Sequence, residues 1–306
     1  MKALVTGGAG FIGSHLADAL CRLGHDVVVV DNLYLGERDN VPQGARFYNI
    51  SIADRRLPGL LRRERPEVVF HLAAQTSVTH SVRNPAFDAM VNVTGSANLI
   101  KGCIEGGVRK VVYAASGGTV YDEPYHLPVD ESHPVRPLSP YGLSKHTVER
   151  YLELYSTLTG LRFTVFRYPN IYGPRQKPAG EAGVVAIFAY QMLRGEQPTI
   201  FGNGNKTRDY VYVSDVVRAN LAAIERGDGG IYNLGTAKEI TDQEVFDTVA
   251  MVTGYKGRAR YAEVRSGEIC CIALDATKAY RELGWEATVP FGEGVALTVD
   301  YVRGRL

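Results

Sequence analysis

The chain has 306 residues, 45% of them hydrophobic and 22% charged, a composition that supports a large buried core and excludes a disordered chain. Its 34 basic and 33 acidic residues give a net charge of +1, which argues against binding nucleic acid or an anionic membrane and favours a small-molecule partner. No apolar run is long enough to span a membrane, and the first predicted strand begins close to Met1. We therefore expect a cytoplasmic protein without a signal peptide.

Four cysteines are present, and their positions do not follow metal-ligand spacing: Cys21, Cys103, Cys270 and Cys271. The sequence predicts no metal site, and free thiols suit a reducing compartment. Because adjacent residues of a strand point to opposite faces, Cys270 and Cys271 are expected to be poorly placed to bridge each other.

Short β-branched runs alternate with segments of helical spacing, which is typical of parallel βαβ units. In chain order, strands are predicted over Ala3–Thr6, Val27–Asp31, Val68–Leu72, Lys110–Ala115 and Arg162–Arg167. Helices are predicted over Phe11–Leu23, Arg56–Arg65 and Tyr141–Leu158. The alternation predicts an α/β fold with a Rossmann-type doubly wound parallel sheet.

After Tyr168 the chain becomes rich in loops before a predicted helix over Val184–Arg194. A further helix over Asp215–Glu225 and a strand over Gly230–Gly235 indicate that the chain returns to the first sheet. We expect an NAD-binding domain over residues 1–170, rejoined by about 211–236. Most of residues 171–306 would then form a smaller C-terminal substrate-binding domain.

The glycines at 7, 10 and 13 lie between the first predicted strand and the first helix, where they permit a tight turn and let a pyrophosphate approach the helix N-terminus. Asp31 ends the second predicted strand 24 residues after Gly7, near the spacing of a carboxylate that binds the adenosine ribose. The alternative is that Asp31 only opens a turn with Asn32. A carboxylate here would repel a 2′-phosphate, so NAD is favoured over NADP.

Tyr141 and Lys145 stand four residues apart at the start of a predicted helix, so their side chains project from one face. A nearby ammonium group favours the phenolate and makes a tyrosine usable as a general base. Taken alone, the pair also fits an exposed tyrosine and a solvated lysine. Ser116 follows the carboxyl end of the strand Lys110–Ala115, where ligands bind in parallel α/β sheets, and its hydroxyl could bond both substrate and phenol.

Five segments together carry a close resemblance to UDP-glucose 4-epimerases, which are extended short-chain dehydrogenases/reductases, and the match runs essentially end to end. These segments are residues 6–13, Asp31-Asn32, 116–121, 139–145 and 208–211. Residues 180–185, Gly-Glu-Ala-Gly-Val-Val, are especially similar to the shorter bacterial and archaeal members of the family.

The resemblance implies Tyr141 as the base, Lys145 as its partner and nicotinamide-ribose anchor, and Ser116 or Thr119 as the hydroxyl near the reacting carbon. It implies NAD contacts at Gly7, Gly10, Phe11, Ile12, Gly13, Asp31, Asn32, Ser51, Ile52, Leu72, Ala73, Ala74, Thr76, Asn92, Tyr141, Lys145 and Tyr168. It implies contacts to a UDP-sugar at Ser116, Asn170, Val185, Ile200, Phe201, Arg208, Arg265 and Glu268. Within that set, Arg208 and Arg265 would bind the diphosphate and Glu268 a uridine ribose hydroxyl.

The chain departs from the family pattern at three places. Ser51-Ile52 replaces an Asp-Ile pair near adenine, and Thr76 replaces a lysine near the cofactor phosphates. The position that gates N-acetylated sugars falls at about Ile272. These departures leave the affinity for NAD and the breadth of substrates open.

The implied activity is NAD-dependent epimerisation at C4 of a UDP-hexose through a 4-keto intermediate, which interconverts UDP-glucose and UDP-galactose in galactose metabolism. UDP-glucuronate or UDP-N-acetylglucosamine 4-epimerase activity remains an alternative. A dehydratase or decarboxylase is less favoured because Gly117-Gly118-Thr119 replaces their acidic residues, and a nonenzymatic NAD-binding module because Tyr141, Lys145 and Ser116 are retained.

The family also implies a homodimer. It would form through the helix that begins near Tyr141 and a helix over about Phe87–Glu105, with Val148, Leu152 and Tyr155 inside the interface. The alternative is that these three side chains pack against the chain's own sheet.

Overall fold

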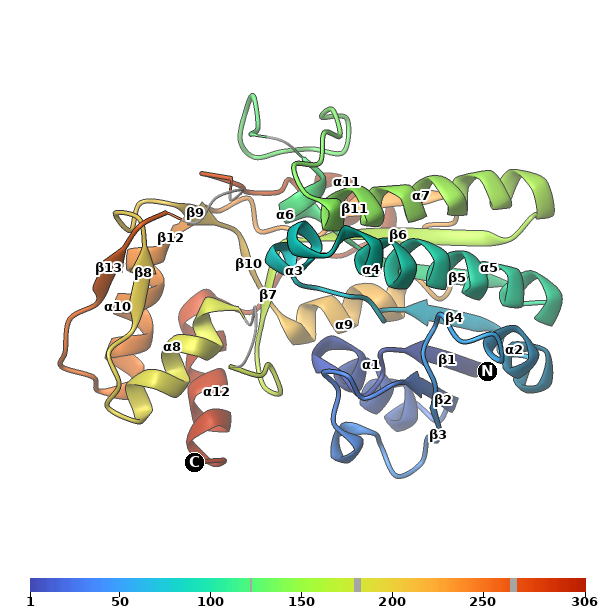
Figure 1. The fold of residues 1–306 in the computed structure, drawn as a ribbon, viewed down its shortest axis with the longest axis horizontal. Helices are drawn as coiled ribbons and strands as arrows, with labels where there is room; N and C mark the ends of the chain where they lie inside the picture. The colour runs from blue at the N-terminus through green and yellow to red at the C-terminus, as the bar shows by residue number, and fades with distance from the viewer. Residues whose placement is uncertain (122, 179–182, 265–268) are drawn as a thin grey trace.

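The computed structural model describes residues 1–121, 123–178, 183–264 and 269–306 and is organised around a seven-stranded parallel sheet (Figure 1). The strand order is β11-β6-β5-β4-β1-β2-β3. The strands are β1 (Lys2–Thr6), β2 (Asp26–Asp31), β3 (Arg46–Asn49), β4 (Val68–His71), β5 (Lys110–Ser116), β6 (Arg162–Tyr168) and β11 (Gly230–Asn233). The predicted Rossmann-type sheet is confirmed. Its order reverses between β1 and β4, and the carboxyl ends of strands at such a switch point are where ligands bind in open α/β sheets.

Helices cover both faces of the sheet, which explains the continuous apolar runs of its strands. Val27 and Val29 face one hydrophobic cluster, while Val28 and Val30 face another. The first face is covered by α1 (Phe11–Arg22) and α9 (Val213–Ala222), and the second by α2 (Leu57–Glu64), α5 (Gly95–Gly106) and α7 (Pro140–Thr159) (Figure 1).

Helix α7 has well-defined ends. The Ser139 hydroxyl caps its N-terminus by accepting a hydrogen bond from the Gly142 N–H at 3.1 Å, and Pro140 occupies the first turn. Gly160 ends the helix with a left-handed backbone conformation. These signals place Tyr141 and Lys145 in the first turns of a long, fixed helix.

A smaller region extends from the carboxyl ends of the strands, with α8, α10 and α12 at the far left of Figure 1. Its strands pair as β7 (Asn170–Tyr172) with β10 (Tyr210–Tyr212), β8 (Thr199–Phe201) with β13 (Arg260–Ala262), and β9 (Thr207–Arg208) with β12 (Ile240–Thr241). The helices are α8 (Val184–Leu193), α10 (Asp242–Thr253) and α12 (Phe291–Arg303). Phe188, Phe246 and Val299 belong to the same apolar cluster as one face of the main sheet, so one continuous core joins the two regions.

The remaining short helices lie near the loops: η1 (Arg38–Asn40), α3 (Val78–Arg83), α6 (Gly117–Val120) and α11 (Thr277–Leu283). The helix predicted over Phe87–Glu105 is divided into α4 (Pro85–Asp88), the π-helix η2 (Ala89–Thr94) and α5. The sequence patterns did not predict β3, α10 or α12. The structure also ends α9 at Ala222, three residues before the predicted end, because the chain turns there to enter β11.

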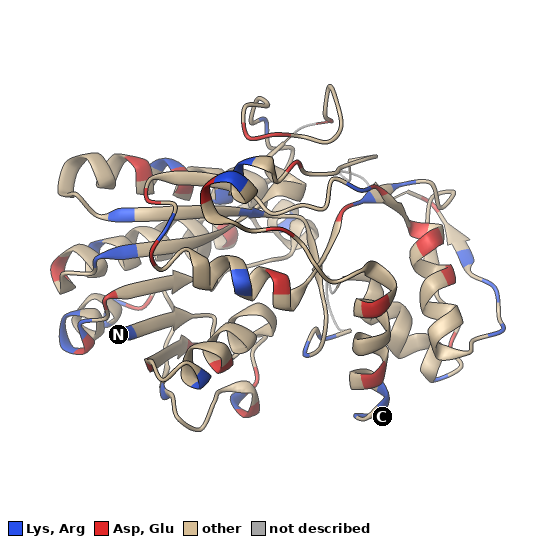
Figure 2. Ribbon diagram, turned by 180° about the vertical axis from the view of Figure 1, so that it is seen from behind, with Lys and Arg blue, Asp and Glu red and all other residues tan. Residues whose placement is uncertain are grey.

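Basic and acidic residues are interspersed along the helices and loops of the ribbon in Figure 2, in agreement with the small net charge. Across the described residues, no helix is both long and apolar enough to cross a membrane.

Candidate active site

Tyr141 and Lys145 lie in the N-terminal part of α7, which approaches the turn that follows β5. Gly142 makes this approach possible: a Cβ atom at residue 142 would sit 2.2 Å from the Thr119 carbonyl oxygen, so no larger residue fits without moving the backbone. The Tyr141 N–H donates a hydrogen bond to the Ser81 hydroxyl at 3.1 Å. The start of α7 is therefore bonded to α3 and packed closely against the turn that carries Ser116 and Thr119.

Ser116 and Thr119 lie at the carboxyl end of β5, in the turn that forms α6. The Thr119 hydroxyl donates to the Ser116 hydroxyl at 2.8 Å, so the two hydroxyls expected near the reacting carbon are joined. Asn170 faces the same turn, because its side-chain oxygen lies 4.0 Å from the position of a Cβ atom at Gly118. The structure thus brings Ser116, Thr119 and Asn170 to one strand end.

Lys145 is buried, and its ammonium group donates a hydrogen bond to the Ala114 carbonyl at 2.8 Å. The ammonium lies 5.8 Å from the centre of the Tyr141 ring and 5.1 Å from that of Tyr113. Burial lowers the pKa of Lys145 to about 8, although the carboxylates of Asp88 and Glu149 act in the opposite direction. Lys145 is therefore a cation at neutral pH, placed to favour a Tyr141 phenolate.

The π-helix beside α7 positions Asn92 in a buried polar network. The Asn92 amide accepts from the Gln75 N–H at 2.8 Å and donates to the Gln75 carbonyl at 3.0 Å and to Asp88 at 3.0 Å. The Ser144 hydroxyl also donates to Asp88. The network links the chain after β4 to α7. Asn92 was expected to contact the cofactor, and in this structure its amide bonds to its own chain.

The glycine turn and Asp31 adjoin each other at the ends of β1 and β2. The Asp31 carboxylate accepts from the Ala9 N–H at 3.0 Å and the Leu33 N–H at 2.8 Å, and one lone pair remains on each oxygen. A Cβ atom at Gly13 would lie 2.1 Å from the Gly7 carbonyl, so this glycine lets α1 pack on the turn. Gly10 is the N-cap residue of α1 and has no side chain to cap the helix, and the first turn of α1 has no acidic residue. A phosphate would find free N–H groups at this helix end.

The other residues expected to bind the cofactor differ in exposure. Leu72, Ala73 and Ala74 follow β4 and are partly exposed, as are Phe11, Ile12 and Ser51. Thr76 and Asn32 are exposed. In contrast, the side chains of Ile52 and Tyr168 are buried, and the Tyr168 hydroxyl accepts from the Asn220 amide at 2.8 Å. Burial raises the pKa of Tyr168, which makes this phenol a poor acid–base group.

Of the residues expected to bind the nucleotide sugar, Val185 and Ile200 have buried side chains, so only their backbones can contact a ligand. Arg208 donates to the backbone carbonyls of Thr207 at 2.7 Å, Ile269 at 2.9 Å and Cys270 at 3.2 Å. Arg265 and Glu268 lie outside the described residues. Phe201 ends β8 and is partly exposed.

A buried polar cluster that the sequence patterns did not predict joins α7 to β6. Arg167 binds both oxygens of Glu149, at 3.0 and 2.7 Å, and donates to the Tyr121 hydroxyl at 2.8 Å. Both charged residues are buried. The missed positions include Gly142 and Asp88, whose roles depend on contacts with distant segments. The sequence offered one signal for these positions: the glycine that follows Tyr141 indicates a close approach of the helix to another segment.

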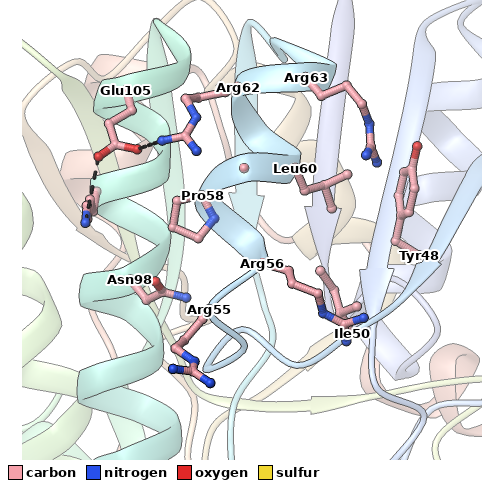
Figure 3. A pocket seen from close by; sticks show the side chains of 12 residues that line it. Tyr48, Ile50, Arg55, Arg56, Pro58, Leu60, Arg62, Arg63, Asn98 and Glu105 are labelled. Atoms are coloured by element: carbon pink, nitrogen blue, oxygen red, sulfur yellow. Dashed lines mark hydrogen bonds and ion pairs between the residues drawn. The ribbon is translucent and has the colours of Figure 1, made fainter.

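A surface groove of about 830 Å³ lies between α2 and α5, away from these residues (Figure 3). Its lining includes Arg56 and Arg62, which form ion pairs with Asp54 and Glu105, each at 2.6 Å. No residue expected to act in catalysis or cofactor binding lines this groove. The candidate active site is therefore placed at the carboxyl ends of the strands, where Ser116, Thr119 and Lys145 are brought together.

Comparisons with known proteins identify the family of this chain. Residues 3–235 match the sequence profile described as the NAD dependent epimerase/dehydratase family. The chain is 46% identical to a putative UDP-glucose 4-epimerase of Methanocaldococcus jannaschii, with 98% of each chain covered.

Two solved structures are similar throughout. The UDP-glucose 4-epimerase of Thermotoga maritima, solved with UDP-glucose, is 48% identical with a TM-score of 0.98, covering 100% of this chain and 99% of that one. The UDP-glucose 4-epimerase of Thermus thermophilus, solved with NAD, is 43% identical with a TM-score of 0.96 and full coverage of both chains. The resemblance predicted from the motifs is confirmed, and the chain belongs to the NAD dependent epimerase/dehydratase family.

Proposed function

We propose that this protein is an NAD-dependent isomerase that epimerises UDP-hexoses at C4 and interconverts UDP-glucose and UDP-galactose. The observation that best supports this proposal is the close approach of α7 to the Ser116–Thr119 turn. Gly142 allows this approach, which brings Tyr141 and Lys145 to the carboxyl end of β5. Full-length relatives at 46% and 48% identity carry the UDP-glucose 4-epimerase name.

The residues at the ends of β1 and β2 fit NAD. The uncapped N-terminus of α1 would bind the pyrophosphate, and the open lone pairs of Asp31 would accept from the adenosine ribose hydroxyls. When bound, the cofactor supplies reversible oxidation of the sugar C4 carbon. We assign this cofactor-binding role to residues 1–170 together with about 211–236, and UDP-sugar binding mainly to residues 171–306.

Proton transfer at the sugar would be carried out by Tyr141. Its phenolate takes the proton of the 4-hydroxyl and later returns a proton to the same oxygen on the inverted sugar. Lys145 keeps the phenolate available because its buried cation lies 5.8 Å from the ring centre. The joined hydroxyls of Thr119 and Ser116 would orient the sugar oxygen by hydrogen bonding.

The nucleotide end of the substrate would be held by the smaller region. Arg208 keeps part of its donor capacity, because three of its five N–H groups account for the carbonyl bonds described above. Arg265 and Glu268 would complete this part of the site, as the family resemblance implies. Firm binding of the diphosphate with looser binding of the sugar suits a reaction in which the sugar must turn.

We also propose that the enzyme is a cytoplasmic homodimer. All four cysteines are free, which supports a reducing compartment. For the dimer, Leu154 and Leu158 on α7 are 54% and 66% exposed, and Tyr151 and Tyr155 adjoin them at helical spacing. A groove between α5 and α7, lined by Ala97, Ile104 and Tyr155 among others, continues this apolar surface.

The test is to incubate the purified protein with UDP-glucose, UDP-galactose, their N-acetyl counterparts and UDP-glucuronate separately, and to resolve the products. We expect interconversion of UDP-glucose and UDP-galactose. Conversion of UDP-glucuronate alone, or release of a decarboxylated or dehydrated sugar, would assign the protein to another branch of the family.

A further inference from the structure

Two thiols that neither catalysis nor cofactor binding uses lie side by side at the edge of the smaller region. Cys270 occupies a bend, and Cys271 donates a weak hydrogen bond to it with the two sulfur atoms 3.5 Å apart. The pair was expected to be poorly placed to bridge within one strand, but the backbone here is a bend and not an extended strand, and it brings the two sulfur atoms near each other. Cys270 is exposed and Cys271 partly exposed, so small thiol reagents can reach the pair.

The segment that carries these thiols, residues 269–275, is held from several sides. The Cys270 carbonyl accepts from the Thr207 N–H at 3.1 Å as well as from Arg208, and the Cys270 N–H donates to Glu123 at 2.7 Å. At its other end, the Leu274 side chain packs against Gly117, the residue after Ser116. A change in the backbone at Cys270 would therefore move a carbonyl to which Arg208 donates.

We propose that Cys270 and Cys271 form a thiol–disulfide exchange site whose oxidation weakens binding of the nucleotide diphosphate. The thiolate of one cysteine attacks a low-molecular-weight disulfide, forming a mixed disulfide and releasing one thiol. The neighbouring thiolate then attacks the protein sulfur of that bond. The Cys270–Cys271 disulfide forms, the second small thiol leaves, and the small disulfide is reduced as the protein loses two hydrogen atoms.

One observation argues against metal binding by this pair, and a second shows what ring closure requires. Among the described residues, no group of three or more His, Cys, Asp or Glu side chains is arranged to hold a metal ion, so the pair has two ligands only. Closing the disulfide requires the sulfur atoms to come from 3.5 Å to about 2 Å, and the bend must change to allow it. That change moves the carbonyls that orient Arg208. The coupling to the ligand rests on the proposed function, in which Arg208 binds the diphosphate.

The experiment treats the reduced protein with oxidised glutathione and measures two quantities. Mass spectrometry of the peptide containing both cysteines reports the bond, and calorimetry with UDP reports the affinity. We expect loss of two hydrogen atoms from the peptide and about tenfold weaker UDP binding, the equivalent of one charged hydrogen bond, with dithiothreitol restoring both. Cys270→Ser and Cys271→Ser should each abolish the response, whereas Cys21→Ser, in the last turn of α1, should retain it.

A glutathione adduct that persists on one sulfur, or chains cross-linked to each other, would overturn the proposed exchange site. Ring closure with unchanged UDP affinity would overturn its coupling to Arg208. If the reduced protein binds no UDP, the proposed function fails together with the coupling, and the peptide mass still decides whether the disulfide forms. Failure of the two proposals is therefore distinguishable.

Discussion

Tyr141 and Lys145 divide the acid–base work between a group that moves a proton and a group that holds a charge. The lysine is buried beside the Tyr113 ring, while the tyrosine is in the first turn of α7, where Gly142 lies against the Thr119 carbonyl. Because the two roles differ, changes at the two residues should have different signatures.

For Tyr141→Phe we expect the fold and NAD binding to be retained and turnover to fall about 100- to 10,000-fold, because only the ionisable oxygen is removed. Steady-state assays with UDP-galactose measure the loss. Tyr280→Phe is the matched control, since Tyr280 lies exposed on α11. Turnover near that of the unmodified enzyme in Tyr141→Phe would remove the residue from its proposed role.

Lys145 should make stability depend on pH in a defined window. Its pKa is about 8 in the folded protein against 10.5 for the unperturbed group, so the folded protein carries the cost of a buried cation below pH 8. Between pH 8 and 10.5 the folded lysine loses its proton before the unfolded one, and the free energy of unfolding should rise by about 3 kcal/mol in total. The measurement is the difference between the original protein and Lys145→Met in chemical denaturation across this range. A difference that stays flat, or falls with pH, would contradict the buried-cation account.

Asp31 should decide between cofactors. A 2′-phosphate would place negative charge against its carboxylate and remove the hydroxyl donors, so NADP should bind more weakly than NAD. Asp31→Ala should weaken NAD binding by about 1.5 to 3 kcal/mol and so reduce the difference in binding free energy between NAD and NADP. Asp31→Asn keeps an acceptor for one of the N–H groups of Ala9 and Leu33, which separates loss of charge from loss of the turn. Titrations on cofactor-stripped protein test this, and equal or tighter NADP binding by the unmodified protein would overturn the assignment.

At the scale of elements, α7 is held to the sheet by the buried ion pair between Glu149 and Arg167. Burial alone would raise the pKa of Glu149, but its hydrogen bonds to His146 and Arg167 keep that pKa below its ordinary value. The pair fixes the helix that carries Tyr141 against the strand next to β5. The position of the base thus depends on an ion pair that does not include the proposed catalytic residues.

We expect Glu149→Gln to lower the free energy of unfolding by about 3 to 5 kcal/mol, because it leaves the buried Arg167 charge without its counter-ion. Glu153→Gln on the same helix is the control, since Glu153 pairs with Arg150, which is 68% exposed, and its loss should cost under about 1 kcal/mol. Denaturant unfolding of both variants gives the comparison. Equal losses of unfolding free energy in the two variants would show that the buried ion pair stabilises the fold no more than the exposed one.

At the scale of the whole molecule, the expected dimer residues divide into two groups. Val148 and Leu152 are each 1% exposed and belong to the core beneath the sheet, so their placement in the dimer interface is corrected: they pack within the chain. Tyr155 remains at the surface between α5 and α7. The apolar stripe left for a second copy is therefore Tyr151, Leu154, Tyr155 and Leu158.

Light scattering at micromolar concentration should give twice the mass of one chain. The double variant Leu154→Glu and Leu158→Glu should give the mass of one chain with the fold retained, because both side chains are exposed in the single chain and would be buried with their charges in the dimer. Leu297→Glu on α12, 44% exposed and outside the stripe, serves as the control. A single-chain mass for the unmodified protein would count against the dimer.

The sequence by itself determined the parallel sheet, the glycine turn with Asp31, and the Tyr141–Lys145 pair. Each of these is a local pattern: β-branched runs, glycine spacing, and two residues one helical turn apart. Local patterns predict well where the backbone conformation depends on neighbouring residues. The strands β1, β2, β4, β5 and β6 accordingly agree with their predicted bounds to within one residue.

Only the tertiary structure decided how α7 meets the Thr119 carbonyl, which residues hold Asp88, and that Cys270 and Cys271 share one side of a bend. It also decided that Val148 and Leu152 face the sheet. The physical reason is that helical or strand spacing defines a face but not what covers it, and that an interaction such as Glu149 with Arg167 joins residues 18 positions apart. Such contacts arise from packing of whole elements, which no single stretch of sequence records.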